Sequence, residues 1–416
     1  MSVHIINVGD ELLNGDTVNT NAAWLAQRFT EVGFSVSEVQ TIADETADIV
    51  AAITRAVASA SLVVVTGGLG PTHDDLTREA AAEAFGVSLQ FDEEWFEVVT
   101  RRFAARGLSV PESNRTQAMV PKGFEILPND LGSAPGLYAS KQVNGVVTAI
   151  AILPGVPSEM RHLVEDRLLP KLRETRSPRA VVHIGTVGIG ESHLQDLLGD
   201  LKKYFNNGLR LAYLPALTGL KLRVTVTDAT TKRAEARAAD VVAEIKSRAI
   251  DYVFSTDGSS LEAVVGRELA ARGLTVALAE SCTGGRVADR LTDVVGASRY
   301  ILAGVVAYSN TAKVELLGVH PETLDHHGAV SEDVAREMAE GVRLRVGADF
   351  GGSTTGILGP DGGTPAKPVG TVWIAVADSR GTTTRRLALG IGREENKMRA
   401  STALLNLLRL RVMAAD

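Results

Sequence analysis

Cysteine is almost absent from this sequence, which has one thiol, Cys282, in 416 residues. A single thiol excludes an intramolecular disulfide framework and is typical of a reducing compartment. No uninterrupted apolar run reaches the roughly 18 residues of a membrane-spanning helix. The N-terminal stretch MSVHIINVGDELL also has no basic region of the kind found in a signal peptide. We therefore expect a soluble, cytoplasmic protein without a membrane partner.

An excess of positive charge is missing as well. The 43 Lys and Arg residues are outnumbered by 50 Asp and Glu residues, which gives a net charge of −7. Nucleic-acid binders neutralise phosphates with clustered Lys and Arg, so we expect no nucleic-acid partner. A small anionic ligand remains compatible, because a few local cations and backbone N–H groups can hold it. The zinc-type spacings HExxH and CxxC do not occur.

The composition that is present is typical of a globular α/β protein, with 45% hydrophobic residues and 40 glycines. The length favours two or three domains. Residues 1–178 and 256–416 each alternate strand-like and helix-like segments, which predicts two three-layer α/β domains with mostly parallel sheets. Residues 179–255 follow a β-α-β-β-α order, which predicts a small α+β domain of the split βαβ type between them. We interpret this small domain as a spacer or dimerisation domain.

The stretch LAESCTGG places Ser281 at the end of a buried strand and directly before an expected helix. A helix start in this place would direct backbone N–H groups at a developing oxyanion, so Ser281 is a candidate nucleophile. The alternative is that Ser281 only caps the helix. Cys282 is a rival nucleophile, although strand alternation turns it to the opposite side from Ser281.

Further polar residues follow the other strands of the same segment. Lys313, in the stretch YSNTAK, can reach the same crevice and act as a general base if its pKa falls well below about 10.4. The alternative is an ordinary solvated helix lysine. Arg393 and Arg399 open the last helix and can hold phosphate or carboxylate in a bidentate fork. The loop STTGILGPDGG permits close backbone approach, as in phosphate-binding loops, through its glycines Gly356, Gly359, Gly362 and Gly363.

The N-terminal segment has a second polar cluster, in the stretch VVVTGGLGPTHDDLTREA. Its glycine N–H groups suit phosphate, and the paired acids Asp74 and Asp75 suit a divalent cation that bridges phosphate oxygens. Alternatively, one of these acids only caps the following helix. Asp44, after another strand, is a further candidate ligand. Downstream polar residues near Gly or Pro turns are Asn114, Gln117, Asn129, Ser133 and Glu159.

The blocks AESCTGG, YSNTAK, GAVSEDVA, GILGPDGG and KPVGTVWIAV, with the closing arginine-bearing helix, closely resemble the nicotinamide-nucleotide amidase domain at the C-terminus of CinA proteins. The resemblance implies hydrolysis of the carboxamide of nicotinamide mononucleotide, without a cofactor, to nicotinate mononucleotide and ammonia. It implies Ser281 as the nucleophile and Lys313 as the base. The other site residues it implies are Tyr308 and Thr355 as supporting groups, and Thr283, Gly284, Gly285, Asn310, Gly356, Gly359, Arg393 and Arg399 as substrate contacts.

The segment from Val3 to about Pro170 resembles the MoaB/MogA-like molybdopterin-binding domain, in the version fused at the N-terminus of CinA proteins. In that context the resemblance implies a metal-dependent ADP-ribose pyrophosphatase. It implies Asp44 and Asp75 as ligands of a divalent metal, whose identity stays open, with Asp75 also catalytic. The implied substrate contacts are Gly67, Gly68, Gly70, Thr72, Asn114 and Gln117.

Membership of this family also implies a homodimer whose partners are small nucleotides, nicotinamide mononucleotide and ADP-ribose. Both activities belong to the recycling of pyridine nucleotides. The alternative hypothesis, from a different functional class, is a non-catalytic pterin- or nucleotide-binding adaptor in competence or DNA-damage responses.

Overall fold

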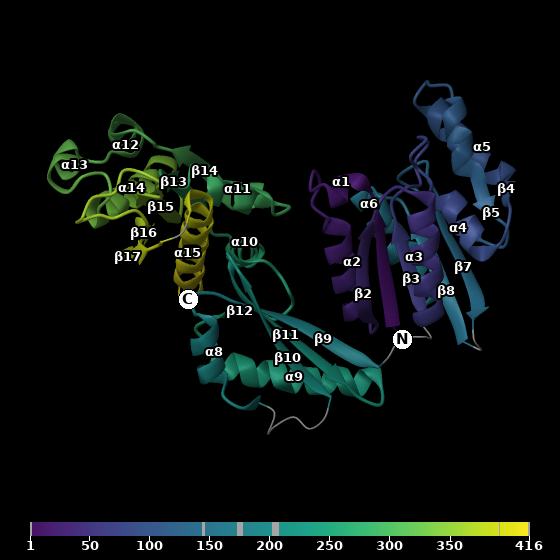
Figure 1. Ribbon diagram of the computed structural model, residues 1–416. Coiled ribbons are helices and arrows are strands. Elements are labelled where there is room, and N and C mark those ends of the chain that lie inside the picture. The colour runs from purple at the N-terminus through teal and green to yellow at the C-terminus, as the bar shows by residue number, and fades with distance from the viewer. Residues whose placement is uncertain (1, 144–145, 173–177, 202–207, 391, 415–416) are drawn as a thin grey trace. The chain divides into compact units, whose positions relative to one another are not determined.

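The computed structural model describes residues 2–143, 146–172, 178–201, 208–390 and 392–414. The chain divides into two compact units, residues 1–181 with 227–234 and residues 182–226 with 235–416. Each unit is described separately (Figure 1). The predicted fold class is confirmed, because both large sheets are mostly parallel and have helices on both faces, and a small α+β sheet lies between them in sequence. The domain boundaries expected after residues 178 and 255 stay a prediction. Residues 173–177, next to the first of them, lie outside the described part of the chain.

The N-terminal unit is built on a six-stranded sheet of order β2-β1-β3-β8-β7-β6. The first four strands in this order run parallel, and β7 and β6 are antiparallel additions. The strands are β1 (Ser2–Val8), β2 (Ser35–Ile42), β3 (Leu62–Thr66), β6 (Glu125–Leu127), β7 (Gly136–Val143) and β8 (Val146–Leu153), with a separate pair β4 (Leu89–Phe91) and β5 (Met119–Pro121). The helices are α1 (Asp10–Leu13), α2 (Thr20–Glu31), α3 (Thr46–Ser59), α4 (Thr77–Phe85), α5 (Glu93–Ala105), η1 (Glu112–Ala118), α6 (Pro157–Leu163), η2 (Val164–Leu168) and α7 (Leu169–Lys171).

Strand alternation gives this sheet two buried faces. Ile6 of β1 packs with Ile53 of α3 on one face, whereas Ile5 packs with Phe29 of α2 on the other. Strands buried on both faces are the reason that runs such as LVVVT contain no polar alternation. The chain leaves β1 for β2 on one side and later returns to place β3 on the other side. Ligands of open α/β sheets bind at such a switch point, beyond the carboxyl ends of the strands.

The C-terminal unit has a five-stranded sheet of order β14-β13-β15-β16-β17, in which the first three strands are parallel. Leu278 packs with Leu404 of α15 on one face of this sheet, and Ala277 packs with Met338 of α14 on the other. The strands are β13 (Val276–Glu280), β14 (Ile301–Val306), β15 (Phe350–Gly356), β16 (Thr371–Asp378) and β17 (Gly381–Ala388). The helices are α10 (Leu261–Arg272), α11 (Arg286–Thr292), η5 (Ala297–Arg299), α12 (Asn310–Leu317), α13 (Pro321–His327), α14 (Glu332–Val346) and α15 (Arg393–Met413).

The small sheet has the order β10-β11-β9-β12. It is formed by β9 (Arg179–Thr186), β10 (Leu209–Ala216), β11 (Gly219–Thr227) and β12 (Val253–Ser255), with helices α8 (Glu191–Leu198) and α9 (Thr231–Arg248). This is the predicted β-α-β-β-α order with one added strand. Among the described residues, no helix is both long and apolar enough to cross a membrane.

Candidate functional sites

Ser281 and Lys313 lie in contact at the carboxyl end of the C-terminal sheet. Ser281 directly follows β13, and its N–H donates to the carbonyl oxygen of Thr354 in the neighbouring strand at 3.0 Å. Lys313 is on α12, which follows β14, and its Nζ lies 3.1 Å from Ser281 Oγ. Both side chains are buried, with exposed fractions of 8% for Ser281 and 1% for Lys313. The two groups that a serine–lysine site requires are therefore within hydrogen-bond distance.

The surroundings of Lys313 shift its protonation equilibrium toward the neutral amine. Burial lowers the pKa of the Lys313 amine from its ordinary value, because desolvation disfavours the charged ammonium. The amine also lies 2.9 Å from the Ala307 carbonyl oxygen and 3.3 Å from that of Tyr308. A neutral amine has two N–H donors and one lone pair. If the carbonyls accept both N–H groups, the lone pair is left for the Ser281 hydroxyl proton, which is the arrangement of a general base.

Cys282 lies beside Ser281 but in a different environment. Its side chain is only 6% exposed, and burial raises the pKa of its thiol to about 12. Because the thiolate is the nucleophilic form, a thiol in this state is inert near neutral pH. The hydroxyl of Ser281 is therefore the better candidate nucleophile of the two.

The expected helix start directly after Ser281 is wrong, because a turn at residues 281–285 precedes α11, which begins at Arg286. The first N–H groups of this helix do not face Ser281. Instead the buried carboxylate of Glu280 accepts hydrogen bonds from Val287 N at 3.1 Å and from Ala288 N at 2.8 Å. The positive end of α11 is thus neutralised by Glu280, a residue that sequence reasoning missed although it is the only acid in the strand VALAE.

Another source of oxyanion donors is the turn itself. Among the described residues, the N–H groups of Cys282, Thr283 and Gly285 in this turn make no hydrogen bond to another backbone group. The turn requires glycine at two places, since Gly284 and Gly285 have φ angles of 63° and 93°. The hydroxyl of Thr283 stabilises the turn by donating a hydrogen bond to the Glu280 carboxylate at 2.6 Å. Backbone N–H groups without a backbone acceptor, close in sequence to a nucleophile, are candidate donors for an oxyanion.

Arg393 connects the segments that surround the pair. Its guanidinium donates to the carbonyl oxygen of Gly359 at 2.9 Å and to the hydroxyl of Tyr308 at 3.0 Å, and Tyr308 is 63% exposed. Lys397, one helical turn after Arg393, approaches the turn at residues 281–285, since its Nζ would lie 3.7 Å from a Cβ built on Gly284. Lys397 was missed from the sequence, although its spacing from Arg393 places both on one face of α15.

The remaining C-terminal candidates lie in less direct positions. The Thr355 hydroxyl is buried and donates to the Ala329 carbonyl oxygen at 2.7 Å, so it fixes β15 against the loop before α14. Gly356 is required by close packing, because a Cβ there would lie 2.9 Å from the Thr371 carbonyl oxygen. Asn310 is exposed at the first position of α12. Arg399 is also exposed and is six residues after Arg393, which puts it on another side of α15.

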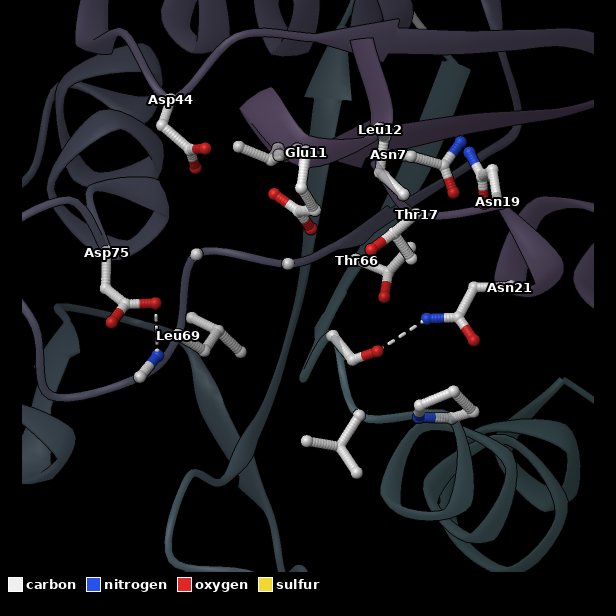
Figure 2. Close-up of a pocket in the computed structure, with 18 of the residues that line it drawn as sticks. Asn7, Glu11, Leu12, Thr17, Asn19, Asn21, Asp44, Thr66, Leu69 and Asp75 are labelled. Carbon is white, nitrogen blue, oxygen red and sulfur yellow. Dashed lines mark hydrogen bonds between the residues drawn. The ribbon is translucent and has the colours of Figure 1, made fainter. Parts of the chain in front are cut away.

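The N-terminal unit contains an open pocket of about 390 Å³ at the switch point between β1 and β3 (Figure 2). The lining comes from four segments that meet at the strand ends. With Asp44 as a single residue outside them, these segments are residues 7–9 with Glu11 and Leu12, residues 17–21, residues 66–70 with Asp74 and Asp75, and residues 155–157. The expected glycine loop and the acids Asp44 and Asp75 are thus brought to one pocket, as Figure 2 shows.

All the charged side chains that line this pocket are acidic. Its lining has four carboxylates, Glu11, Asp44, Asp74 and Asp75, and no Lys, Arg or His. Burial, followed by repulsion from Asp10, raises the pKa of Asp44, and Asp10 N donates to its carboxylate at 2.8 Å. An anionic diphosphate would be repelled here unless a cation accompanied it. The all-oxygen donor set is the type that Mg²⁺ prefers.

The described residues contain no group of three or more His, Cys, Asp or Glu side chains arranged to hold a metal ion. Mg²⁺ commonly binds one or two carboxylates together with substrate phosphates and waters. Asp44 fits the role of such a ligand best. The carboxylate of Asp75 accepts from Gly70 N at 2.7 Å and from Thr72 N at 2.9 Å, and also from the Thr72 hydroxyl. Asp75 therefore holds the glycine loop in shape.

The glycines of this loop are required by its geometry. A Cβ on Gly67 would lie 2.2 Å from the Val8 carbonyl oxygen, and one on Gly68 would lie 2.2 Å from Thr77 Oγ1. Behind the loop lies the buried side chain of Arg78, which donates to the carbonyl oxygens of Leu69 at 2.7 Å and Gly70 at 3.1 Å. Arg78 was missed from the sequence, and it is a cation placed beneath a loop suited to phosphate.

Other N-terminal candidates lie away from the pocket lining. Asn114 and Gln117 are buried on η1, where the Asn114 amide donates to Gln117 at 2.8 Å. Asn129 donates to Glu159 at 2.7 Å, and the Ser133 carbonyl oxygen accepts from Trp95 at 3.2 Å. Their position near Gly and Pro turns reflects the packing of those turns.

Comparison with known families matches three consecutive parts of the chain. Residues 4–174 match "Probable molybdopterin binding domain", residues 183–255 match "Damage-inducible protein CinA KH domain" and residues 258–412 match "CinA C-terminal domain". Among solved structures, the competence/damage inducible protein CihA of Agrobacterium tumefaciens is 37% identical, covers 37% of this chain and 97% of its own, and has a TM-score of 0.36.

Full-length relatives are also similar along nearly the whole sequence. A CinA-like protein of Salinibacter ruber is 45% identical over 407 residues, which is 97% of this chain and 98% of the relative. A CinA-like protein of Chloroherpeton thalassium is 42% identical over 415 residues, or 98% and 99% of the two chains. With all three parts matched in order and relatives aligned from end to end, the chain belongs to the CinA family.

Proposed function

We propose that the C-terminal unit hydrolyses the carboxamide of nicotinamide mononucleotide, giving nicotinate mononucleotide and ammonia. The observation that carries this proposal is the 3.1 Å contact between Lys313 Nζ and Ser281 Oγ, in which the lysine is buried. A buried amine beside a hydroxyl supplies a base and a nucleophile without a metal. The similarity of residues 258–412 to the CinA C-terminal domain is consistent with this assignment.

The proposed reaction has two halves. Lys313 takes the Ser281 proton as Oγ attacks the carboxamide carbon, and the N–H groups of Thr283 and Gly285 stabilise the resulting oxyanion. The C–N bond then breaks, and Lys313 returns the proton to the leaving nitrogen, so that ammonia departs and a serine ester remains. Water, deprotonated by Lys313, attacks this ester. The bond from the acyl carbon to Ser281 Oγ then breaks, Lys313 returns its proton to Oγ, and the acid product loses its proton to solvent as nicotinate mononucleotide leaves.

The cationic side chains of α15 suit the phosphate of the substrate. Arg393 lies beside Tyr308, and Lys397 lies beside the turn at residues 281–285, so both reach the surroundings of Ser281. A nicotinamide mononucleotide bound with its phosphate against these cations would place the carboxamide at the serine. Binding energy from the phosphate would then hold the carbonyl in position for attack.

The test is ammonia release from nicotinamide mononucleotide by the full-length protein. Ser281→Ala is expected to lower the rate by at least about 10³-fold, because the nucleophile is lost. Cys282→Ala is the matched control in the adjacent position and is expected to retain activity. Absence of ammonia release by the wild type, or unchanged release by Ser281→Ala, would contradict the proposal.

For the N-terminal unit, we propose metal-dependent hydrolysis of the diphosphate of ADP-ribose, in which water cleaves the P–O–P bond to give AMP and ribose 5-phosphate. The supporting observation is a pocket that combines a glycine loop with four carboxylates and has no basic side chain in its lining. When bound, a divalent cation neutralises the diphosphate and polarises its phosphorus. Asp44 would hold the cation, and Arg78 and Asp75 would keep the loop N–H groups in position for the phosphates.

This second activity is tested by following AMP formation while Mg²⁺ is added and removed. Asp44→Asn is expected to raise the Mg²⁺ concentration needed for half-maximal rate by about 10- to 100-fold. Asp48→Asn, an exposed acid on α3 outside the pocket, is the matched control. Turnover that is indifferent to chelator would overturn the metal-dependent proposal.

A non-catalytic binding role is the second candidate for the N-terminal unit. It is favoured by the engagement of both Asp75 oxygens within the glycine loop, which leaves Asp44 as the better placed of the two proposed ligands. The family name of residues 4–174 refers to molybdopterin. Tight binding of a pterin or nucleotide without turnover, at saturating Mg²⁺, would select this role over the pyrophosphatase.

A further inference from the structure

Two side-chain oxygens in the N-terminal pocket have no hydrogen-bond partner. Asn7, at the end of β1, and Asn21, at the start of α2, both line the pocket, and the Oδ1 atom of each is buried and unpaired among the described residues. The Asn7 side chain is 0% exposed. Buried polar atoms are almost always paired, so two unpaired acceptors in one pocket require an explanation.

The orientation of both carboxamides is fixed by their nitrogen atoms. Asn7 Nδ2 donates to the Gln40 carbonyl oxygen at 2.9 Å, and Asn21 Nδ2 donates to the Gly155 carbonyl oxygen at 2.7 Å. Rotating either amide by 180° would place its oxygen against a carbonyl oxygen, where neither atom can donate. Each side chain therefore keeps an acceptor available. The partner of the Asn7 amide nitrogen, Gln40 of β2, lies 33 residues away in sequence.

Two neighbouring polar groups of the pocket are already engaged in hydrogen bonds. The Asn19 oxygen accepts from Ala22 N at 2.9 Å as the N-cap of α2, and the Thr66 hydroxyl donates to the Pro154 carbonyl oxygen at 3.0 Å. Figure 2 shows Asp44 and Asp75 on one side of the pocket, and Asn7, Asn19 and Asn21 on the other. The acidic side is suited to a cation with phosphates, and the amide side retains two open acceptors.

We propose that Asn7 and Asn21 form a recognition site for neutral hydrogen-bond donors of the ligand, namely hydroxyl groups of a ribose or an exocyclic amine of a base. This proposal rests on the nucleotide-diphosphate function proposed above and adds the direction in which the ligand binds. Amide oxygens attract O–H and N–H groups and disfavour phosphate oxygens, which are acceptors like themselves. The diphosphate is thereby directed to the glycine loop, and the sugar or base to the amides.

Removal of the acceptors tests the proposal through binding. Calorimetry of the full-length protein with ADP-ribose and Mg²⁺ is expected to show about tenfold weaker binding for Asn7→Leu and for Asn21→Leu, because a desolvated donor of the ligand would lose its partner. Asn129→Leu is the matched control, since Asn129 is a buried amide paired within the protein and outside the pocket. It is expected to lower Tm and to leave the affinity unchanged. Asn21→Leu keeps the test valid if Asn7→Leu does not fold.

Altered ligands identify which hydrogen-bond donor of the ligand binds the two asparagines. The inosine counterpart of ADP-ribose replaces the exocyclic amine by a carbonyl oxygen, and the deoxyribose counterparts remove ring hydroxyls. A loss of about tenfold for one of these, which disappears in the Asn→Leu variants, supports the proposal and names the donor. Affinities of both variants within twofold of wild type would overturn it.

Turnover is measured separately, so that the two proposals fail in different ways. Binding that depends on Asn7 and Asn21 without AMP formation would leave the recognition site standing and contradict the pyrophosphatase. AMP formation with unchanged KM in both variants would leave the pyrophosphatase standing and contradict the recognition site. Absence of ADP-ribose binding by the wild type would contradict both.

Discussion

The two α/β sheets carry their candidate sites at the same topological position but with opposite chemistry. In the N-terminal sheet the pocket follows β1 and β3, and in the C-terminal sheet Ser281 follows β13 beside β15. The first site presents four carboxylates without a basic side chain, whereas the second presents a buried lysine against a hydroxyl. The fold therefore determines where a site forms, and the residues at the strand ends determine which reaction it suits.

The sites also differ in how complete they are. Ser281 and Lys313 already make the contact that proton transfer requires, and Glu280 is neutralised by the start of α11. In the N-terminal pocket, burial and then repulsion from nearby acids raise the pKa of Asp44. A cation and a donor-rich ligand would relieve this repulsion and pair the open amides. Four predictions test this difference between the two sites.

The largest effect is expected from Lys313→Met. Removal of the base should lower kcat for ammonia release by about 10²- to 10⁴-fold, while AMP formation from ADP-ribose stays unchanged. Both rates are measured on the same preparation. Lys246→Met, on α9, is the control for loss of a lysine elsewhere. A variant that keeps more than a tenth of the amidase rate would remove Lys313 from the proposed chemistry.

The second prediction concerns pH. Because the pKa of Lys313 is lowered from 10.5, the amidase rate should rise about tenfold per pH unit at low pH and level off below pH 10.5. The unfolded state holds this proton to higher pH than the folded state, so the free energy of unfolding should also rise with pH between the two pKa values. Rate profiles and denaturant titrations measure the two effects. An amidase rate that levels off only at the ordinary lysine pKa of 10.5 would contradict the assignment of Lys313 as the base.

A smaller effect is expected from Arg78→Met. Without the donors to Leu69 and Gly70, the glycine loop should lose its shape, and the KM for ADP-ribose should rise by about tenfold, while amidase kinetics stay unchanged. Arg78→Lys keeps the positive charge but lacks the two-pronged guanidinium, and its KM should lie between those of the wild type and Arg78→Met. Arg409→Met removes a buried arginine of the C-terminal unit and serves as the matched control. An unchanged KM in Arg78→Met would show that the loop holds its shape unaided.

The smallest effect is expected from thiol alkylation. With a pKa raised to about 12 and a buried side chain, Cys282 should react slowly with iodoacetamide at neutral pH, and amidase activity should stay within about twofold over the exposure. Mass spectrometry gives the labelled fraction alongside the residual rate. Rapid labelling with parallel inactivation would instead point to an accessible thiolate beside Ser281.

Much of the fold was predictable from the sequence, because strand runs such as VVVT and VALA are followed by glycine turns and amphipathic helices. The same reasoning predicted that Ser281 and Lys313 share a sheet edge, and the structure places them 3.1 Å apart. Their catalytic roles remain predictions. The carboxyl ends of neighbouring parallel strands meet at one edge of the sheet. The closeness of Ser281 and Lys313 could therefore be predicted without knowledge of side-chain packing.

The residues that were missed depend on contacts distant in sequence. Asn7 has its amide partner 33 residues away, so its open oxygen is visible only once β1 and β2 are paired. Glu280 caps a helix that begins six residues later, after a turn whose length the sequence does not indicate. Arg78 resembles any helix arginine until the glycine loop is folded over it. In each case tertiary packing, rather than local pattern, selects the function of the side chain.

The amine of Lys313 is oriented by the carbonyl oxygens of Ala307 and Tyr308, which directly follow β14, the edge strand of its sheet. The orientation of the Lys313 amine therefore depends on residues that follow an edge strand. Transient fraying of β14 would release both carbonyls and allow the amine to rotate and rehydrate before the sheet itself unfolds. Low denaturant concentrations should accordingly abolish the proposed amidase activity and accelerate amide hydrogen exchange at Val305 and Ala307. At the same concentrations the amides of the other strands should stay protected.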